Sequence, residues 1–116
     1  MMSLALHSRW MGVRISTIYA TGGASANRDV LQVMADVFDA DVFQLETGNS
    51  AALGAAIRAF HADRLASGSP IEWEDAIAGF VVPRPDSRLK PIPAHAETYR
   101  ALTNRYAELE LQSLGR

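Results

Sequence analysis

The feature that most constrains the fold of this chain is a strand-like run that ends abruptly at two glycines. Residues 15–20 are rich in β-branched and aromatic side chains, which favours a strand. Gly22 and Gly23 interrupt that pattern, and small residues then lead to Asn27. From Asn27 to about Ala40 the apolar residues recur with the period of a helix. The order of strand, glycine turn and helix is typical of an α/β fold.

The rest of the chain predicts a second strand and several more helices. The expected elements are a helix ending near Gly12, a strand over 42–45, a helix over about 51–66, a short helix over 72–80 and a last helix over 95–114. Four of the five prolines fall in 83–93, so this proline-rich arm is expected to run extended. The two strands and the helix between them predict a right-handed β-α-β crossover.

Apolar stripes run along the later helices. The stripe on the 51–66 helix consists of Leu53, Ala56, Ile57, Phe60 and Leu65, and that on the last helix of Tyr99, Leu102, Tyr106 and Leu109. Gly54 stands among four alanines, which predicts a bare helix face packed closely on another backbone.

Composition excludes several classes of protein. The 116 residues hold 13 acidic and 11 basic side chains, a net charge of −2, so no overall positive field would attract nucleic acid. There is no cysteine, which excludes disulfides and thiolate chemistry. Apolar stretches are too short for a membrane span, and no secretory signal is evident, so we expect a cytoplasmic protein that binds neither membrane nor nucleic acid.

Polar clusters elsewhere favour ordinary structural roles. His7, His61 and His95 lie far apart with no ligand spacing, so they are expected to be surface residues and no metal site is predicted. The acidic group within 72–75 suits the solvated start of a helix. The tryptophans and tyrosines are expected in the core or at an interface.

The glycine turn is the candidate functional site. Gly22, Gly23 and Ala24 would let the backbone approach a phosphate group, with exposed N–H groups and the positive end of the following helix completing an anion site. Ser25 and Asn27 are both suitable N-caps of that helix. A plain tight turn is the alternative reading, because the sequence is neither a P-loop nor a dinucleotide-binding fingerprint.

Three motifs in order resemble the FGGY carbohydrate kinases, with a leaning towards the xylulokinases. They are the TGGASAN turn at 21–27, the QVMADV stretch at 32–37 and the AALGAA stretch at 51–56. The proline-containing arm and the tyrosine-bearing last helix also look like the end of such a kinase. The resemblance runs from about Ile15 to Leu111.

This resemblance implies an actin-like ATPase (ribonuclease H-like) fold, with residues 1–116 as the C-terminal nucleotide-binding part of a sugar kinase that uses ATP and Mg²⁺. Residues 1–4 carry no functional weight, since they could derive from an expression vector. By the resemblance, Gly22, Gly23 and Ala24 would hold phosphates, and Asn27 would reach the adenine or ribose. Gly54 would be a packing residue. For Asp36, hydrogen bonding on the helix surface is favoured over a structural contact beneath the nucleotide.

The parts of such a kinase that carry the sugar pocket and the catalytic base have no counterpart in this sequence. We therefore assign no catalytic residue and expect the chain alone to be inactive, with a sugar bound only together with the N-terminal domain of such a kinase. The edges of the two strands, and the apolar helix faces that would meet those parts of such a kinase, are expected to be open, which predicts a homo-oligomer. A non-catalytic binding or assembly module is the alternative function, and another ATPase of the same superfamily is a third reading.

Overall fold

The computed structural model describes residues 1–46 and 48–115. In chain order its elements are α1 (Met2–Trp10), β1 (Thr17–Ala20), the 3₁₀ turn η1 (Gly23–Ala26), α2 (Arg28–Phe38), β2 (Asp41–Gln44), α3 (Ser50–Ala66), α4 (Trp73–Ile77) and α5 (Pro93–Ser113). These bounds confirm the predicted order of helices and strands. Thr47, in the turn before α3, and Arg116, at the end of the predicted domain, lie outside the described residues.

The two strands pair in parallel, so the segment from β1 through α2 to β2 is the predicted β-α-β crossover. Thr17 lies opposite Asp41, and Ala20 lies opposite Gln44. The strand pairing continues one residue further, because the N–H of Leu45 donates to the carbonyl of Ala20 at 3.0 Å. The glycine turn therefore begins at the carboxyl end of a hydrogen-bonded strand.

The core lies between α2 and one face of this sheet. It is formed by Ala20, Leu31, Ala35 and Val42, with Ile18, Met34 and Leu89 packed around them. Neighbouring residues of a strand point to opposite faces, so Tyr19 and Phe43 lie on the other face. Their rings are 5.8 Å apart, and Tyr19 is half exposed. Among the described residues, helix packing therefore covers only one face of the sheet.

The proline-rich arm at 83–93 is extended, as predicted, except at a turn over 85–86, where Asp86 has φ 57°, and it also pairs with β2. Val42 and Leu89 exchange two backbone hydrogen bonds of 2.9 and 2.8 Å in antiparallel orientation. The N–H of Arg84 donates to the carbonyl of Gln44 at 2.8 Å. The prolines lack N–H donors, and the residues between them make these bonds. The pairing covers the outer edge of β2, so the prediction that both strand edges are open was wrong for this edge.

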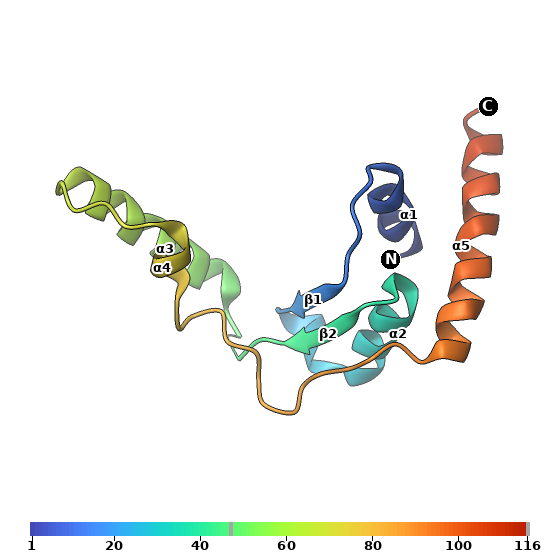
Figure 1. The fold of residues 1–116 in the computed structure, drawn as a ribbon, viewed down its shortest axis with the longest axis horizontal. Coiled ribbons are helices and arrows are strands. Elements are labelled where there is room, and N and C mark those ends of the chain that lie inside the picture. The colour runs from blue at the N-terminus through green and yellow to red at the C-terminus, as the bar shows by residue number, and fades with distance from the viewer. Residues whose placement is uncertain (47, 116) are drawn as a thin grey trace.

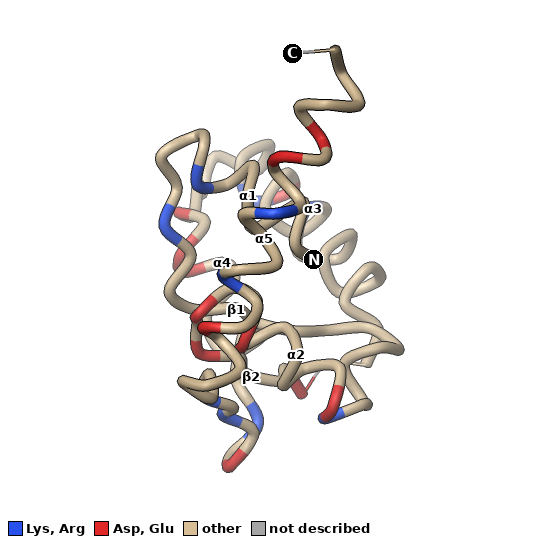
Figure 2. The backbone as a smooth tube through the Cα atoms, turned by 90° about the vertical axis from the view of Figure 1, so that its right-hand side faces the viewer, with Lys and Arg blue, Asp and Glu red and all other residues tan. Residues whose placement is uncertain are grey.

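The helices form two groups, which lie to the left and to the right of the strands in Figure 1. On one side α5 packs along α2 and α1. On the other side α3 and α4 contact each other and project away from the sheet as a separate arm. Acidic and basic residues are interspersed over these elements (Figure 2). No helix in the described part of the chain has both the length and the apolar character needed to cross a membrane.

The apolar face of α3 is open, as predicted. None of the residues of α3 is buried, and Phe60 and Leu65 are 47 and 63% exposed. A Cβ placed on Gly54 would meet no described atom within 4 Å, so the predicted close packing is not made within this chain. Among the described elements, the main packing partner of α3 is the short α4, which has five residues rather than the predicted 72–80 helix.

The buried face of α5 differs in part from the predicted stripe, of which Tyr99 and Tyr106 are half-buried. Ala96 and Thr103 are its buried residues, whereas Leu102 and Leu109 are exposed. A small residue and a threonine fit there because α5 lies close against α2 and α1. Trp10 and Trp73, expected in a core or interface, are 55 and 42% exposed.

Candidate functional site

The candidate site is the turn between β1 and α2. Gly22 has φ 85° and ψ −176°, a conformation that is open almost only to glycine. The chain then forms the short 3₁₀ turn η1 and enters α2. Gly22, Gly23 and Ala24 are exposed, and no described atom accepts a hydrogen bond from the N–H groups of Gly23 and Ala24. The turn thus presents free backbone donors at the carboxyl end of a strand.

Hydrogen bonds to Ser25 fix the shape of this turn. Its N–H and its hydroxyl both donate to the carbonyl of Gly22, at 3.1 and 2.7 Å. Ser25 is buried at the centre of the turn and does not cap α2. The side chain of Gln44, at the end of β2, donates to the carbonyl of Ser25 at 2.6 Å. Sequence reasoning missed Gln44, because only the parallel pairing of β1 and β2 brings it to the turn.

Asn27 is the N-cap of α2, as predicted. Its side-chain oxygen accepts hydrogen bonds from the N–H groups of Asp29 at 2.9 Å and Val30 at 3.2 Å. This bonding satisfies two of the free donors at the start of the helix and holds Asn27 beside the glycines. Its side-chain nitrogen takes no part in the capping bonds. A contact between this nitrogen and a nucleotide stays a prediction.

The arrangement is suited to binding an anion. Free N–H groups lie a few residues before the positive end of an eleven-residue helix, and both favour negative charge. A Cβ added to Gly22 or Gly23 would have no atom of the described residues within 4 Å apart from its chain neighbours, so a phosphate group has room to reach the backbone. The carboxylate of Asp29 lies in the first turn of α2. It is the negative charge nearest in sequence to the glycine turn, and it would repel a bound anion.

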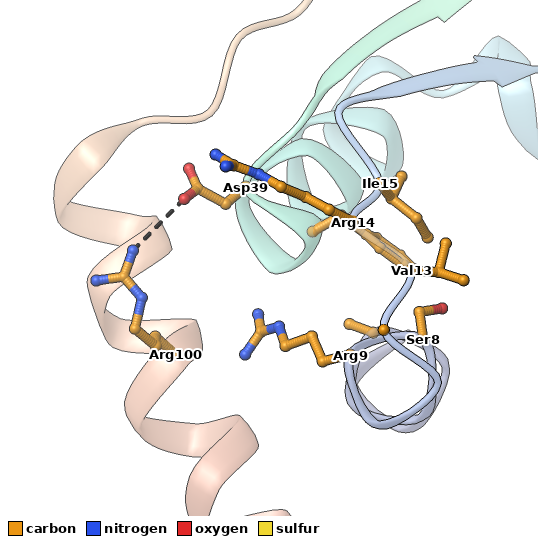
Figure 3. Close-up of a pocket in the computed structure, with 10 residues that line it drawn as sticks. Ser8, Arg9, Val13, Arg14, Ile15, Asp39 and Arg100 are labelled. Atoms are coloured by element: carbon orange, nitrogen blue, oxygen red, sulfur yellow. Dashed lines mark hydrogen bonds and ion pairs between the residues drawn. The ribbon is translucent and has the colours of Figure 1, made fainter.

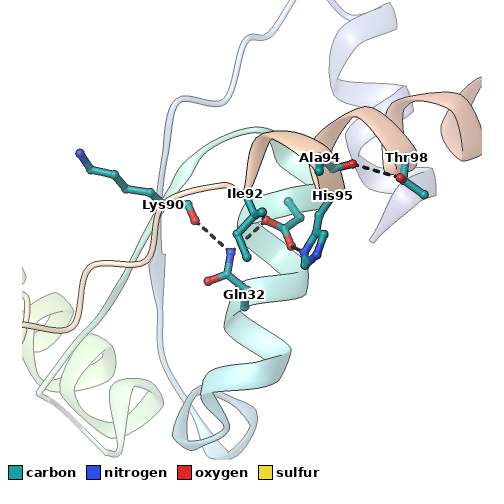
Figure 4. A network of polar contacts seen from close by, with 7 residues as sticks. Gln32, Lys90, Ile92, Ala94, His95 and Thr98 are labelled. Carbon is teal, nitrogen blue, oxygen red and sulfur yellow. Dashed lines mark hydrogen bonds and ion pairs between the residues drawn. The ribbon is translucent and has the colours of Figure 1, made fainter.

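Asp36 occupies a different position from the predicted helix surface. It is 2% exposed and accepts hydrogen bonds from the side chain of Gln32 at 2.9 Å, the N–H of Ile92 at 2.8 Å and Nδ1 of His95 at 3.0 Å (Figure 4). Gln32 also donates to the carbonyl of Lys90 at 2.9 Å. Through these hydrogen bonds Asp36 connects the arm and the start of α5 to α2. The expectation of surface hydrogen bonding was wrong.

The ionisation of Asp36 reflects these partners. Desolvation by burial raises the pKa of the Asp36 carboxyl, but the hydrogen bonds from Ile92, Gln32 and His95, together with the charge of His95, outweigh it. The net effect holds the pKa of Asp36 below its ordinary value. At neutral pH the carboxylate is thus charged and its oxygens already accept three hydrogen bonds, so it is unsuited to accept a proton from a substrate.

The three histidines lie in three separate environments. His95 contacts Asp36, and Nε2 of His7 lies 3.1 Å from a carboxylate oxygen of Glu110. The ring of His61 stacks on Trp73 with 3.8 Å between centroids. Within 1–46 and 48–115, no three potential ligands of the His, Cys, Asp or Glu type gather as a metal site would require. The acidic residues at 74–75 lie in the first turn of α4, as predicted.

The first half of the chain is similar to a known protein family. Residues 1–62 match the model of the FGGY family of carbohydrate kinases, C-terminal domain, and the chain belongs to this family. The family has the actin-like ATPase fold, which confirms the predicted fold class. The matched segment runs from α1 into α3 and includes the glycine turn.

Relatives extend the match to the whole chain. The xylulose kinase of Rattus norvegicus is 42% identical over 99% of this chain and 21% of its own length. That of Mus musculus is 40% identical over 97% of this chain and 20% of its own length. The ribulokinase of Halalkalibacterium halodurans is 34% identical over 90% and 18%. The chain spans about a fifth of the length of these relatives.

Proposed function

We propose that this chain is the C-terminal nucleotide-binding part of a sugar kinase, and that the sugar is D-xylulose. The turn at 22–24 is the observation that carries the proposal. Its free N–H groups and the start of α2 make a surface that can hold phosphate groups of ATP. The names of the rodent relatives support xylulose as the substrate, although this chain covers only a fifth of their length.

In this proposal the glycine turn positions the phosphate groups of ATP. In phosphoryl transfer most of the catalysis comes from holding the phosphates in line with the acceptor and from stabilising charge. Gly23 and Ala24 would donate to phosphate oxygens, and the side-chain nitrogen of Asn27 would reach the ribose or adenine. Mg²⁺ would neutralise phosphate charge when bound. Gln44 and Ser25 would keep the turn in its binding shape, because they fix the carbonyls on its inner side.

A direct test is to add ADP with Mg²⁺ and to follow the amide resonances of the chain. We expect Gly22, Gly23 and Ala24 to shift, with affinity in the millimolar range (about −4 kcal/mol), since a single wall contacts the ligand. Gly23→Val should abolish these shifts, because its side chain would fill the space where phosphate approaches. Gly54→Val is the matched control, since Gly54 also has no neighbour within 4 Å but lies on α3. Shifts that survive Gly23→Val would contradict the proposed site.

The chain alone is expected not to phosphorylate a sugar. A general base must reach the attacking hydroxyl, and Asp36 is buried and bonded to three partners. Asp29 lies next to the turn, where its charge would repel phosphate. ATP consumption in the presence of D-xylulose, L-ribulose, glycerol or gluconate should therefore equal the blank without protein. Sugar-dependent turnover that disappears with Asp29→Asn would show that the chain is a complete enzyme.

The same experiments address the alternative function. A chain that keeps its fold but shows no shift at the turn with ADP would favour a non-catalytic binding or assembly module.

A further inference from the structure

A cavity lined by charged and apolar side chains lies where the chain leads from α1 towards β1 (Figure 3). Its volume is about 390 Å³, and it is bounded by the end of α1, the segment at 12–15, the end of α2 and the side of α5. Its charged lining residues are Arg9, Arg14, Asp39 and Arg100. They come from four separate segments, so the cavity exists only in the folded chain.

The lining carries an excess of positive charge. Asp39 lies 3.5 Å from Arg100, and Figure 3 shows the guanidinium of Arg9 pointing into the space between α1 and α5. Within the described residues neither Arg9 nor Arg14 forms an ion pair. Three guanidinium groups against one carboxylate leave a charge of +2 in a chain of net charge −2. The carbonyl ends of α1 and α2 offset about one unit of this, so a positive excess remains.

The cavity is separate from the proposed nucleotide site. Its lining residues lie before β1 (5–15), before β2 (Phe38 and Asp39) and on α5 (Arg100), whereas the glycine turn follows β1. The four residues of β1 span about 13 Å at about 3.3 Å per residue, so one phosphate group cannot occupy both places. A ligand bound at the cavity therefore leaves the glycine turn free.

We propose that this cavity binds the phosphate group of a small phosphorylated compound. Guanidinium groups match phosphate oxygens in charge and in planar, two-point geometry. Val13, Ile15 and Phe38 add an apolar wall, which suits an organic part attached to the phosphate. The volume lies at the lower end of the range for small-molecule pockets, about 300–1,000 Å³. This proposal goes beyond the proposed kinase function and does not rest on it.

Amide resonances of the 116-residue chain, followed during titration, test the proposal. The probes are inorganic phosphate and ribose 5-phosphate, at constant ionic strength set with chloride. We expect the amides of Gly12, Arg14 and Asp39 to shift, while those of Gly22 to Ala24 shift less. Tighter binding of ribose 5-phosphate assigns the site to phosphorylated compounds, and equal binding assigns it to free phosphate. Absence of shifts at Gly12 and Arg14 with both probes would overturn the proposal.

Three variants distinguish a site from general attraction. Arg9→Gln should weaken binding about tenfold, because a charged hydrogen bond to phosphate is lost. Arg58→Gln makes the same change in net charge on α3, outside the cavity, and should leave binding unchanged. Asp39→Asn removes the opposing carboxylate and should strengthen binding several-fold. Asparagine tolerates the left-handed backbone at this position, φ 52°, so the fold is kept, and a gain in affinity cannot come from unfolding. Equal weakening by Arg58→Gln, or no gain with Asp39→Asn, would overturn the proposal.

Discussion

At the scale of single residues, the buried carboxylate of Asp36 connects three segments of the chain. Its partners are Gln32 on the same helix, Ile92 at the end of the arm and His95 in the first turn of α5. A buried charge is tolerated only when donors surround it, and here each oxygen has at least one. This residue therefore sets where α5 begins and how it lies on α2.

Asp36→Asn is expected to destabilise the fold by about 2 kcal/mol, because hydrogen bonds to a charged acceptor are lost and an amide group faces the donor of Gln32. Urea unfolding followed by circular dichroism measures the change. Asp63→Asn, the same substitution at an exposed position on α3, should change the free energy of unfolding by no more than about 0.5 kcal/mol. Equal effects of the two variants would contradict a structural role for the buried carboxylate.

Lowering the pH should weaken the hydrogen bonds that Asp36 accepts, and it should do so over a defined pH range. Because the pKa of Asp36 is lower in the folded than in the unfolded chain, its contribution is complete above the unfolded pKa of about 3.9 and is lost as pH falls through the folded value. The difference in unfolding free energy between the wild type and Asp36→Asn should therefore narrow below about pH 4. A difference that stays constant down to pH 2 would show that this carboxyl group does not titrate with unfolding.

Asn27 caps α2, and substitutions can separate this role from the proposed contact with a nucleotide. Asn27→Ala removes the cap of α2 and should cost about 1 kcal/mol of stability. Asn27→Asp keeps the capping oxygen but removes the side-chain nitrogen. If that nitrogen contacts the nucleotide, Asn27→Asp should keep stability and weaken ADP binding in the resonance titration. Unchanged ADP binding with Asn27→Asp would limit Asn27 to capping.

At the scale of elements, the sequence predicted the parts whose pattern is local. The β-branched run, the glycines, the cap at Asn27 and the stripe of α2 identified β1, the turn, α2 and β2 correctly, because each depends on neighbouring residues. The pairing of the arm with β2 and the burial of Asp36 depend on contacts such as Val42 with Leu89 and Asp36 with Ile92, which lie 47 and 56 positions apart. The periodic pattern of apolar residues along the sequence carries no information on such contacts, so these features could not be predicted. The same holds for the arginine-lined cavity, whose four charged residues come from distant segments.

The turn offers a matched pair of substitutions. Gly22→Ala should cost about 1–3 kcal/mol, since φ 85° with ψ −176° is strained for any residue with a Cβ. Gly23→Ala should cost less, because Gly23 has no such backbone angle and an added Cβ meets nothing within 4 Å at either position. Urea unfolding of the two variants checks the order. A loss for Gly23→Ala equal to that of Gly22→Ala would contradict the conformational explanation.

At the scale of the whole molecule, the chain is more open than a compact domain. Its radius of gyration is 18.0 Å, against about 13 Å expected for a folded chain of this length. Its accessible surface is 7962 Å², against about 6,200 Å² for a compact protein of 12.6 kDa. The excess arises where α3 and α4 project from the sheet and where Tyr19 and Phe43 lie on its uncovered face. Parallel strands in stable domains are covered on both faces, so this surface is expected to be buried by another chain.

We therefore expect the 116-residue chain to form dimers or larger assemblies at micromolar concentration. An apolar cavity of about 300 Å³ between α3 and α4, lined by Leu53, Ile57, Trp73 and Phe80, adds to the surface that favours association. Light scattering coupled to gel filtration gives the mass. Ile57→Glu places a charge in this cavity and should shift the population towards monomer, whereas Arg58→Glu, one residue along the same helix and outside the cavity, should not. A monomeric mass of the unchanged protein would contradict the prediction, and it would mean that the one covered face of the sheet suffices for a stable fold.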